Sequence, residues 1–371
     1  MKEPIRILHV LQRMEAGGTQ ALLMNIYRNI DRSKIQFDFL VEYPNKHFYD
    51  DEIVSLGGKI YYSNVRKDKN IFKFTKLLTN IIKENNYKIL HMHTYSIGYF
   101  VLKTAKKCGV PVRIAHSHSN NMTNDYRKYL KKILQKLYPI YATDYMACSS
   151  DAGRYLFKNR EFVVLKNAID SKKFIFKKSI RDRVRNELKI NDAFVVGHVG
   201  RFQPEKNHTF LIDVFYEIKK RKSNAKLLLV GNGDPNDNLI DKIKVMNLDN
   251  DVIILKNRSD VNELYQAMDV FIFPSLYEGL GIVAIESQAA GTPVIISNGV
   301  PDEAIVSPIC IKMNLDDLCV NWANEVIKLS QHIYAHSDMH KYVVNSGYDI
   351  EETALKIEKY YSEKYYKKIL K

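Results

Sequence analysis

The sequence is poor in cysteine and contains no long apolar run. Its 371 residues include only four cysteines, Cys108, Cys148, Cys310 and Cys319, which are far apart and form no C-x-x-C pair. This scatter excludes a disulfide framework and a zinc ribbon, and it indicates buried thiols. No apolar run approaches the roughly 18 residues that a membrane-spanning helix needs, so an integral membrane protein is excluded.

A secretory signal is also missing from the start of the chain. Met1 to Pro4 lead directly into an apolar run, Ile5–Val10, with no small-residue cleavage site. This pattern predicts a cytoplasmic protein.

Acidic residues are in deficit. The chain has 56 Lys and Arg against 42 Asp and Glu, a net charge of +14. Nearly all of the excess lies in residues 1–170, which hold 28 basic and 15 acidic residues. A positive field of this size favours an anionic partner such as a phosphate compound, a nucleic acid or an acidic membrane. Composition alone does not choose among the three.

Short β-branched or aromatic runs alternate with segments of helical period along the whole chain. This alternation is typical of βαβ units, and the length is that of two domains. The predicted fold class is therefore α/β, with two Rossmann-like, doubly wound parallel-sheet domains. We place them at residues 1–170 and 192–350, joined by a charged linker at 171–191. Residues 351–371 are predicted to form a helix that packs back on the first domain, because its tyrosines favour burial.

A strand, a glycine-bearing loop and a helix follow one another within Phe271–Gly291. The strand ends near Pro274 and the helix begins near Ile282, so backbone N–H groups at Leu280, Gly281 and Ile282 would face an anion. Glu278 in the loop and Glu286 in the helix are candidates to accept hydrogen bonds from sugar hydroxyls. The alternative is an ordinary βα loop with both carboxylates on its surface.

Two further loops follow predicted strands and would lie at the same edge of the sheet. Arg201 and Lys206 share the loop after the strand at 194–199, and together they would neutralise a diphosphate; alternatively, each is a surface cation beside Glu205. Gly231 and Gly233 follow the next strand and allow close backbone approach, although a third glycine of a dinucleotide fingerprint is lacking.

Taken together, these motifs resemble those of the retaining glycosyltransferases of family 4. The resemblance covers nearly the whole chain, and its specific part is the second half, at these positions: Arg201, Lys206, Glu278, Gly279, Gly281, Glu286, Gly291, Pro293 and Val294. It implies a GT-B fold that binds a nucleotide-sugar, with Arg201 and Lys206 on the diphosphate, Glu278 on the sugar and Glu286 on the ribose.

Two positions depart from the family pattern. The glycine expected after the third strand of the second domain is absent near Arg258, in the loop that would contact the base, and Ala168 replaces a glycine after Asn167. A uridine nucleotide is therefore an expectation from the family alone. Asn167 is assigned to the acceptor side, and Arg258 to the donor site.

The first half offers the remaining candidate residues. Gly17 and Gly18 form a loop that the resemblance places beside the donor phosphates, with Thr19 on the acceptor side; the alternative is a plain turn that Thr19 caps. His118 is the first candidate for the family's catalytic histidine and His116 is the second. His91 and His93 also alternate on a strand, but without a third ligand they do not indicate a metal site.

The other possible cation site is the pair Asp249 and Asp251. It precedes a strand and so lies at the amino edge of the sheet, away from the binding edge, which favours a turn. No metal and no other cofactor is expected.

The sequence thus predicts a cytoplasmic, metal-independent, retaining glycosyltransferase. It would transfer a sugar from a nucleoside diphosphate, UDP by family expectation, to a glycan or lipid-linked acceptor in surface polysaccharide synthesis such as capsule. The alternatives are a nucleotide-sugar epimerase of the same fold and a basic nucleic-acid-binding protein.

Residues Tyr126–Tyr138 form a helical pattern with one apolar and one basic face, which predicts peripheral contact with an anionic membrane. The alternative is a core-packed helix with a solvated basic face.

Overall fold

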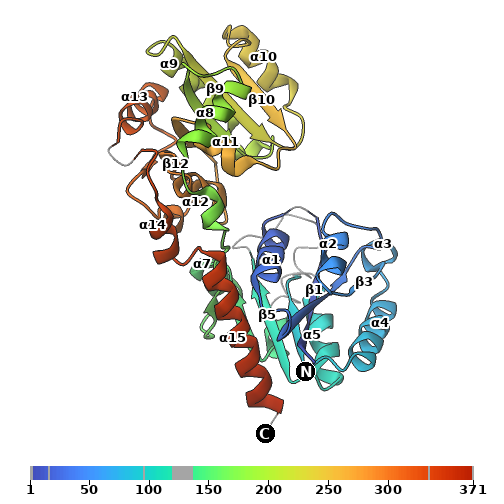
Figure 1. The fold of residues 1–371 in the computed structure, drawn as a ribbon. Coiled ribbons are helices and arrows are strands. Elements are labelled where there is room, and N and C mark those ends of the chain that lie inside the picture. The colour runs from blue at the N-terminus through green and yellow to red at the C-terminus, as the bar shows by residue number, and fades with distance from the viewer. Residues whose placement is uncertain (1–2, 16, 95–96, 119–136, 333–334, 370–371) are drawn as a thin grey trace. The chain divides into compact units, whose positions relative to one another are not determined.

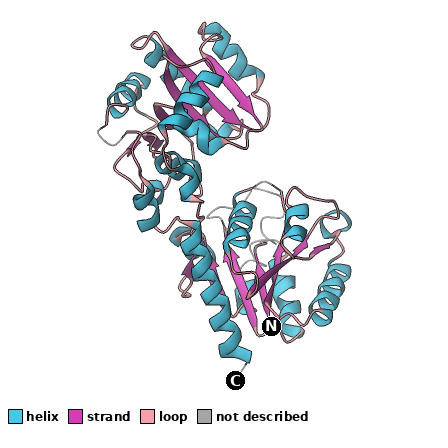
Figure 2. Cartoon of the chain, in the orientation of Figure 1, coloured by secondary structure: helices cyan, strands magenta, loops and turns pink. Residues whose placement is uncertain are grey.

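The structure is a computed structural model that describes residues 3–15, 17–94, 97–118, 137–332 and 335–369. The chain divides into two units (Figure 1). Unit 1 comprises Met1–Ile169 together with Asp349–Lys371, and unit 2 comprises Asp170–Tyr348. In both units, helices cover the two faces of a sheet (Figure 2).

Unit 1 is built on a seven-stranded sheet in the order β3-β2-β1-β4-β5-β6-β7, with every neighbouring pair parallel. Successive residues of β1 supply two cores, because Ile7 and Leu11 point to one side of the sheet and Leu8 and Val10 to the other. The strands are β1 Ile5–Leu11, β2 Ile35–Val41, β3 Ile60–Tyr62, β4 Ile89–Met92, β5 Val112–Ser117, β6 Asp144–Ala147 and β7 Val163–Val164.

Two helices of unit 1 begin after a polar residue whose side chain caps the helix N-terminus. The Asn70 side chain accepts a hydrogen bond from the backbone N–H of Lys73, and Ser149 caps the helix that follows it in the same way. The described helices are α1 Gly18–Asn29, α2 Asp50–Ser55, α3 Val65–Asp68, α4 Ile71–Glu84, α5 Gly98–Lys107, α7 Ser150–Phe157 and α15 Ile350–Ile369, with a 3-10 turn η1 at Tyr138–Ile140.

Helix α15 comes from the end of the chain and lies along unit 1, against α1 and β5 (Figure 1). Its side chains Ile350, Ile357 and Tyr361 are buried in the same core as Ile7, and Tyr360 and Tyr365 are partly buried beside them. The tyrosines that suggested burial in the sequence are therefore the residues that hold this helix in place.

Unit 2 is built on a six-stranded parallel sheet in the order β10-β9-β8-β11-β12-β13. Its strands are β8 Phe194–Val199, β9 Ala225–Gly231, β10 Val252–Lys256, β11 Val270–Phe273, β12 Val294–Ser297 and β13 Cys310–Met313. Its helices are α8 Lys178–Glu187, α9 His208–Lys219, α10 Asp237–Val245, α11 Val261–Ala267, α12 Ile282–Ala289, α13 Cys319–Leu329 and α14 His340–Asn345, with 3-10 turns η2 Ser171–Phe174, η3 Pro204–Lys206 and η4 Asp302–Ala304.

The segment 171–191 is not a free linker, and that expectation is corrected. It lies within unit 2 and contains η2 and α8. Arg181 and Arg185 both form ion pairs with Asp269, and Arg185 is 93% buried. The charges suggested exposure, but these two guanidinium groups join α8 to the residue that precedes β11.

Candidate functional site

The carboxyl ends of β8, β9 and β11 bring three loops together in unit 2. β8 lies between β9 and β11, so the loops that follow Val199, Gly231 and Phe273 share one edge of the sheet. Two of them touch through their backbones, because a Cβ atom on Gly231 would lie 1.9 Å from the carbonyl oxygen of Gly200. Glycine at position 231 is thus required by this contact.

Lys206 and Glu278 meet at the centre of these loops. The Lys206 Nζ donates to Glu278 Oε1 at 2.5 Å, and the two side chains are only 16% and 14% exposed. The loops are further joined by the backbone N–H of Leu276, which donates to the carbonyl of Glu205 at 2.8 Å. The alternative, that Lys206 is a surface cation beside Glu205, is therefore wrong, because Lys206 is largely buried and pairs with Glu278, 72 positions away in the sequence.

The N-terminus of α12 opens beside this pair. Gly281, the residue before the helix, has a φ of +82°, and a Cβ atom there would lie 3.0 Å from Phe273 and from Val300. Gly281 supplies no side-chain cap to this end of the helix, and the first backbone N–H groups of a helix have no partner within the helix itself. Leu280 is buried and Gly279 is exposed in the preceding loop, so the predicted anion-binding residues form one continuous segment up to Ile282.

Glu286 lies on α12, one turn into the helix. The hydroxyl of Tyr265 donates to Glu286 Oε2 at 3.0 Å. Burial raises the pKa of this carboxyl to about 7, and the hydrogen bond from Tyr265 offsets only part of that rise. Glu286 is therefore divided between its acid and its carboxylate form near neutral pH.

The other predicted donor-site residues differ in how available they are. Arg201 is exposed and has no ion pair within the described ranges. Gly233 has a φ of +91° in its turn. The Arg258 guanidinium is already paired with Asp260, with 2.7 Å between Nε and Oδ1. Arg258 therefore lies in the loop after β10 but is engaged by a neighbouring carboxylate.

Two histidines near Lys206 were not anticipated from the sequence. His198 on β8 and His208 at the start of α9 lie with their ring centroids 4.8 Å apart, and each has a buried Nε2 atom without a partner among the described residues. Burial, followed by the charge of Lys206, lowers the pKa of His208 to about 4. The signal in the sequence was their position, since both flank the loop that carries Arg201 and Lys206.

In unit 1, Gly17 precedes α1 and its carbonyl accepts from the N–H of Ala21, while Gly18 and Thr19 open the helix. A Cβ atom on Gly17 would lie 2.7 Å from Gln20 Oε1. Asn167 follows β7, and its Oδ1 atom is buried without a partner in the described part of the chain. These residues lie on separate segments of the unit.

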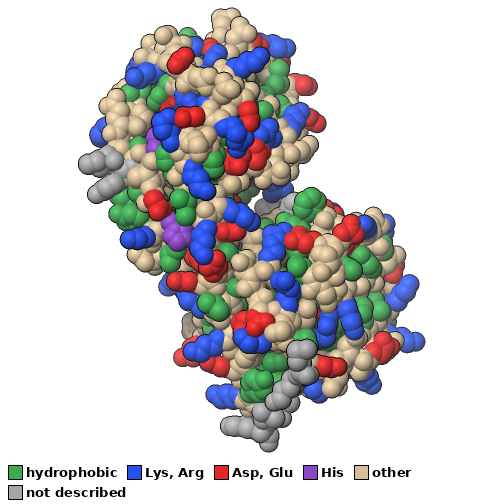
Figure 3. Space-filling view, in the orientation of Figure 1, with side chains coloured by type: hydrophobic (Ala, Val, Ile, Leu, Met, Phe, Trp, Pro, Cys, Tyr) green, Lys and Arg blue, Asp and Glu red, His purple; other side chains and the backbone are tan. Residues whose placement is uncertain are grey.

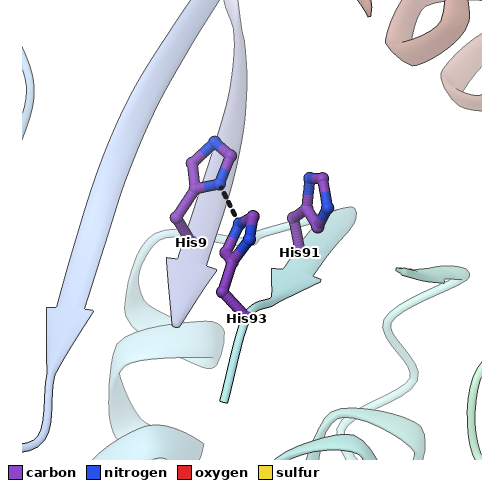
Figure 4. Close-up of side chains that lie close together, drawn as sticks. All are labelled: His9, His91 and His93. Atoms are coloured by element: carbon purple, nitrogen blue, oxygen red, sulfur yellow. Dashed lines mark hydrogen bonds between the residues drawn. The ribbon is translucent and has the colours of Figure 1, made fainter. Parts of the chain in front are cut away.

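Five histidines cluster on, or directly after, three adjacent strands of unit 1. His9 on β1 lies beside His91 on β4 in the parallel register, and His93 directly follows β4. His116 lies on β5, and His118 directly follows it. One nitrogen from each of His9, His91 and His93 lies within 4.8 Å of the others, as does one from each of His93, His116 and His118 (Figure 4). The premise that His91 and His93 lack a third ligand is therefore wrong.

Hydrogen bonds join the rings in two rows. One row runs from His9 Nδ1 to His93 Nε2 at 3.0 Å and from His93 Nδ1 to His118 Nε2 at 2.8 Å. The other runs from the Tyr361 hydroxyl to His91 Nδ1 at 2.6 Å and from His91 Nε2 to His116 Nδ1 at 3.1 Å. His118, the first candidate, is half-buried, and His116, the second candidate, is buried.

Burial keeps these rings neutral. It lowers the pKa of His9 and of His118 to about 3, and it lowers the pKa of the other three well below the usual value for histidine. At neutral pH the cluster therefore consists of uncharged imidazole rings that are joined by hydrogen bonds.

Two other sequence predictions concern the surface. Asp249 and Asp251 form a turn before β10, and Asp251 is paired with Lys219 and Lys226, each at 2.9 Å, at the amino edge of the sheet. The basic segment Tyr126–Tyr138 lies almost entirely outside the described residues. Among the helices that the structure describes, none has the length and apolar character required to cross a bilayer.

Comparison with known proteins gives the class of this fold. Over 96% of this chain and 100% of the other, the structure resembles HepE of Anabaena, solved in complex with UDP, with a TM-score of 0.80 and 18% identity. The two parallel α/β units are those of a GT-B glycosyltransferase.

The sequence places the chain within that class. The description "Glycosyl transferases group 1" matches residues 180–307, and "Glycosyltransferase Family 4" matches residues 16–173. The chain is 35% identical over 334 residues to EpsF of Bacillus subtilis, covering 87% of each. It is 27% identical over 302 residues to CapH of Staphylococcus aureus, a capsular polysaccharide biosynthesis glycosyltransferase, covering 79% of this chain and 81% of CapH. The chain belongs to the family 4 glycosyltransferases and is an enzyme that transfers sugars.

Proposed function

We propose that this enzyme transfers a sugar from a UDP-linked donor to a hydroxyl of a glycan or lipid-linked acceptor, with retention of configuration and without a metal, in the synthesis of a surface polysaccharide. The observation that carries the proposal is the largely buried pair of Lys206 and Glu278 beside the uncapped N-terminus of α12. The similarity to CapH supports the setting in polysaccharide synthesis.

The diphosphate is assigned to cations and backbone dipoles of unit 2. Lys206 supplies a positive charge in a site from which water is largely excluded, Arg201 supplies an exposed guanidinium, and the N-terminus of α12 supplies free N–H groups. These groups are worth most where negative charge develops on the leaving phosphate. They do the work that a divalent cation does in other transferases, and this is why no metal is expected.

Two carboxylates are assigned to hydroxyl groups of the donor. Glu278 keeps one oxygen near Lys206 and accepts from the sugar, whereas Glu286 accepts from the ribose. Glu286 depends on pH, because its pKa of about 7 leaves it partly protonated in neutral solution.

The transfer step follows from the groups available. The bond between the anomeric carbon and the phosphate oxygen breaks, and a bond between the same carbon and the acceptor oxygen forms on the same face. The hydroxyl proton passes to an oxygen of the leaving diphosphate. His118, with His116 as second candidate, is assigned to a hydrogen bond with the transferred sugar or the acceptor, Gly17 and Gly18 to the donor phosphates, and Thr19 and Asn167 to the acceptor side.

We place the enzyme in the cytoplasm, at the inner face of the membrane. The excess of basic residues in 1–170 supports this placement. On the face shown in Figure 3, Lys and Arg side chains lie among Asp and Glu side chains, so no uniformly basic patch is visible there. The proposal therefore also rests on the segment 126–138, of which residues 126–136 lie outside the described residues.

The function is tested by a panel of nucleoside diphosphate sugars. We expect UDP-sugars to raise the melting temperature of the enzyme and to be hydrolysed slowly without acceptor, with retained configuration in the released sugar. Matched ADP- and GDP-sugars serve as controls for the base. An absence of any shift with the whole panel would contradict the donor assignment, and an inverted product would contradict retention.

A further inference from the structure

The turn between α3 and α4 of unit 1 presents an aromatic side chain among lysines. Phe72, in the first turn of α4, is 88% exposed, whereas Phe74, two positions later, is 2% exposed and belongs to the core. We propose that Phe72 and the lysines around it form a docking surface for an anionic lipid bilayer. Its use in catalysis rests on the lipid-linked acceptor of the function proposed above, but the contact itself is testable without any substrate.

The charge of this segment is strongly positive. Residues 66–76 contain five basic residues and one acidic residue. Asp68, the acidic one, accepts a hydrogen bond from the backbone N–H of Asn70 at 2.9 Å, so it serves the turn itself. The exposed lysines of the segment are Lys67, Lys69, Lys73 and Lys76. A surface of this composition is complementary to negatively charged headgroups.

The turn holds the surface in one shape. The side chain of Asn70 caps α4 by accepting from the N–H of Lys73 at 2.8 Å, and Lys69 adopts the left-handed conformation with a φ of +54°. Phe72 and Lys76 are four positions apart and therefore lie on one face of α4. The phenyl ring and the ammonium group are thus presented together on the side of the helix that faces away from the core.

This turn lies at the end of the sheet to which the acceptor is assigned. β3 ends at Tyr62, and the chain passes through α3 before it returns along α4 (Figure 1). The helix that connects two parallel strands starts at the carboxyl end of the first of them. Arg66 of α3 forms an ion pair with Glu42, which directly follows β2, and this pair fixes α3 at the same end. A bilayer that touches Phe72 is therefore close to the edge at which α1 begins, where a lipid-linked acceptor would enter.

The residue types favour a bilayer over a protein or a nucleic acid. A stable protein interface has a contiguous apolar core, whereas Phe72 is a single exposed apolar side chain among ammonium groups. Arginine is the usual residue for forked contacts with nucleic acids, and Arg66, the only arginine of residues 65–84, is already paired with Glu42. An aromatic ring that enters the interface beside lysines that attract anionic lipids is typical of peripheral membrane segments.

Fluorescence of the full-length enzyme tests the contact. Phe72→Trp adds an exposed indole, while the one tryptophan of the chain, Trp322, is buried in unit 2. Vesicles of phosphatidylglycerol and phosphatidylcholine should shift the emission to shorter wavelength, and brominated acyl chains should quench it. Vesicles of phosphatidylcholine alone should do neither. Val245→Trp on α10 is the matched control, because Val245 is 81% exposed and follows Lys244, and its emission should stay unchanged.

Two further variants measure the contributions of the ring and of one charge. Phe72→Ser should weaken binding to the anionic vesicles about tenfold, and Lys69→Asn should weaken it about fivefold. Both should leave the melting temperature unchanged, because Phe72 is exposed and asparagine readily adopts the left-handed conformation of position 69. Lys328→Asn, at an exposed lysine of α13, is the matched control and should leave binding unchanged.

Three outcomes would overturn the proposal. The first is an emission of Phe72→Trp that stays unchanged while the enzyme still sediments with anionic vesicles, which would assign the membrane contact to another segment. The second is an absence of any binding to anionic vesicles at low salt. The third is the same shift produced by a single-stranded RNA or by self-association of the enzyme without vesicles. The donor assignment fails separately, because the panel of nucleoside diphosphate sugars is measured without lipid.

Discussion

Replacing Lys206 separates its contribution to catalysis from its contribution to folding. Its ammonium lies 2.5 Å from Glu278 Oε1 and 5.2 Å from the centre of the Phe273 ring. Lys206→Met keeps most of the apolar stem and removes only the charge. The change takes one cation from the leaving diphosphate, for which we expect a loss in turnover of 10²-fold or more, about 3 kcal/mol.

The cost to folding follows from burial. Breaking a fully buried pair costs about 3–5 kcal/mol and breaking an exposed one about 0–1 kcal/mol. The Lys206–Glu278 pair, at 16% and 14% exposure, lies between these limits, and we expect about 2 kcal/mol. For a unit of this size, that corresponds to a fall in melting temperature of about 4–8 °C.

A second substitution distinguishes the two effects. Adding Glu278→Gln to Lys206→Met removes the unpaired carboxylate, so the melting temperature should largely recover while turnover stays low. Arg201→Ala should lower turnover to a similar extent without changing the melting temperature, because Arg201 is exposed. Lys220→Ala removes a surface cation paired with Glu217 and is the matched control.

The assays are release of the nucleoside diphosphate and thermal unfolding of the same samples. Near-normal turnover in Lys206→Met or in Arg201→Ala would refute the diphosphate assignment. A melting temperature of the double variant as low as that of Lys206→Met would refute the account of the pair.

Three further outcomes are expected. Because the pKa of Glu286 is raised to about 7, the donor KM should rise as the pH falls through that value and the carboxylate is protonated. Glu286→Gln should abolish this dependence on pH. A KM that does not change from pH 6 to 8 (about one unit either side of 7) in the unmodified enzyme would count against the ribose contact. Activity should survive EDTA, and loss on chelation with recovery on adding Mg²⁺ or Mn²⁺ would mean that Asp249 and Asp251 were dismissed wrongly. The enzyme should bind anionic but not neutral liposomes, and this binding should be salt-sensitive. Changing Lys128, Lys131 and Lys132 to Glu should weaken the binding, because each lysine contributes about 1 kcal/mol. Equal binding to both kinds of liposome, or none to either at low salt, would contradict the membrane contact.

Much of the fold could be predicted because buried parallel strands are encoded by recognisable apolar runs in the sequence. Apolar runs such as Ile5–Val10 are continuous since both faces of the sheet are covered, and glycines or polar residues mark where they end. The start of α12 at Ile282 was placed correctly for the same reason. β13 was not anticipated, because Cys310–Met313 ends in a lysine and a methionine and is only four residues long.

The contacts within the site could not be predicted, because they depend on strand order. Lys206 meets Glu278 only because β8 lies next to β11, and the alternation of strands and helices does not reveal that adjacency. The histidine rows likewise require the register of His9 beside His91. The misplaced linker has a different cause, since the sequence shows the charge of Arg185 but not the partly buried Asp269 that pairs with it.

The chain leaves unit 1 after Ile169 and re-enters it at Asp349, where the N–H of Ile350 donates to the carbonyl of Ile169 at 2.9 Å. A gene fragment encoding only the first 169 residues would therefore omit Ile350, Ile357 and Tyr361 and expose the apolar surface that they cover. Recombination between related transferases meets the same constraint. A single exchange, after residue 169 or before residue 349, would join the first part of the unit 1 core of one protein to the last helix of another. A double exchange at both points would move residues 170–348 as one contiguous insert. New combinations of donor and acceptor specificity should accordingly arise more easily by replacement of the middle of the gene than by exchange of its ends.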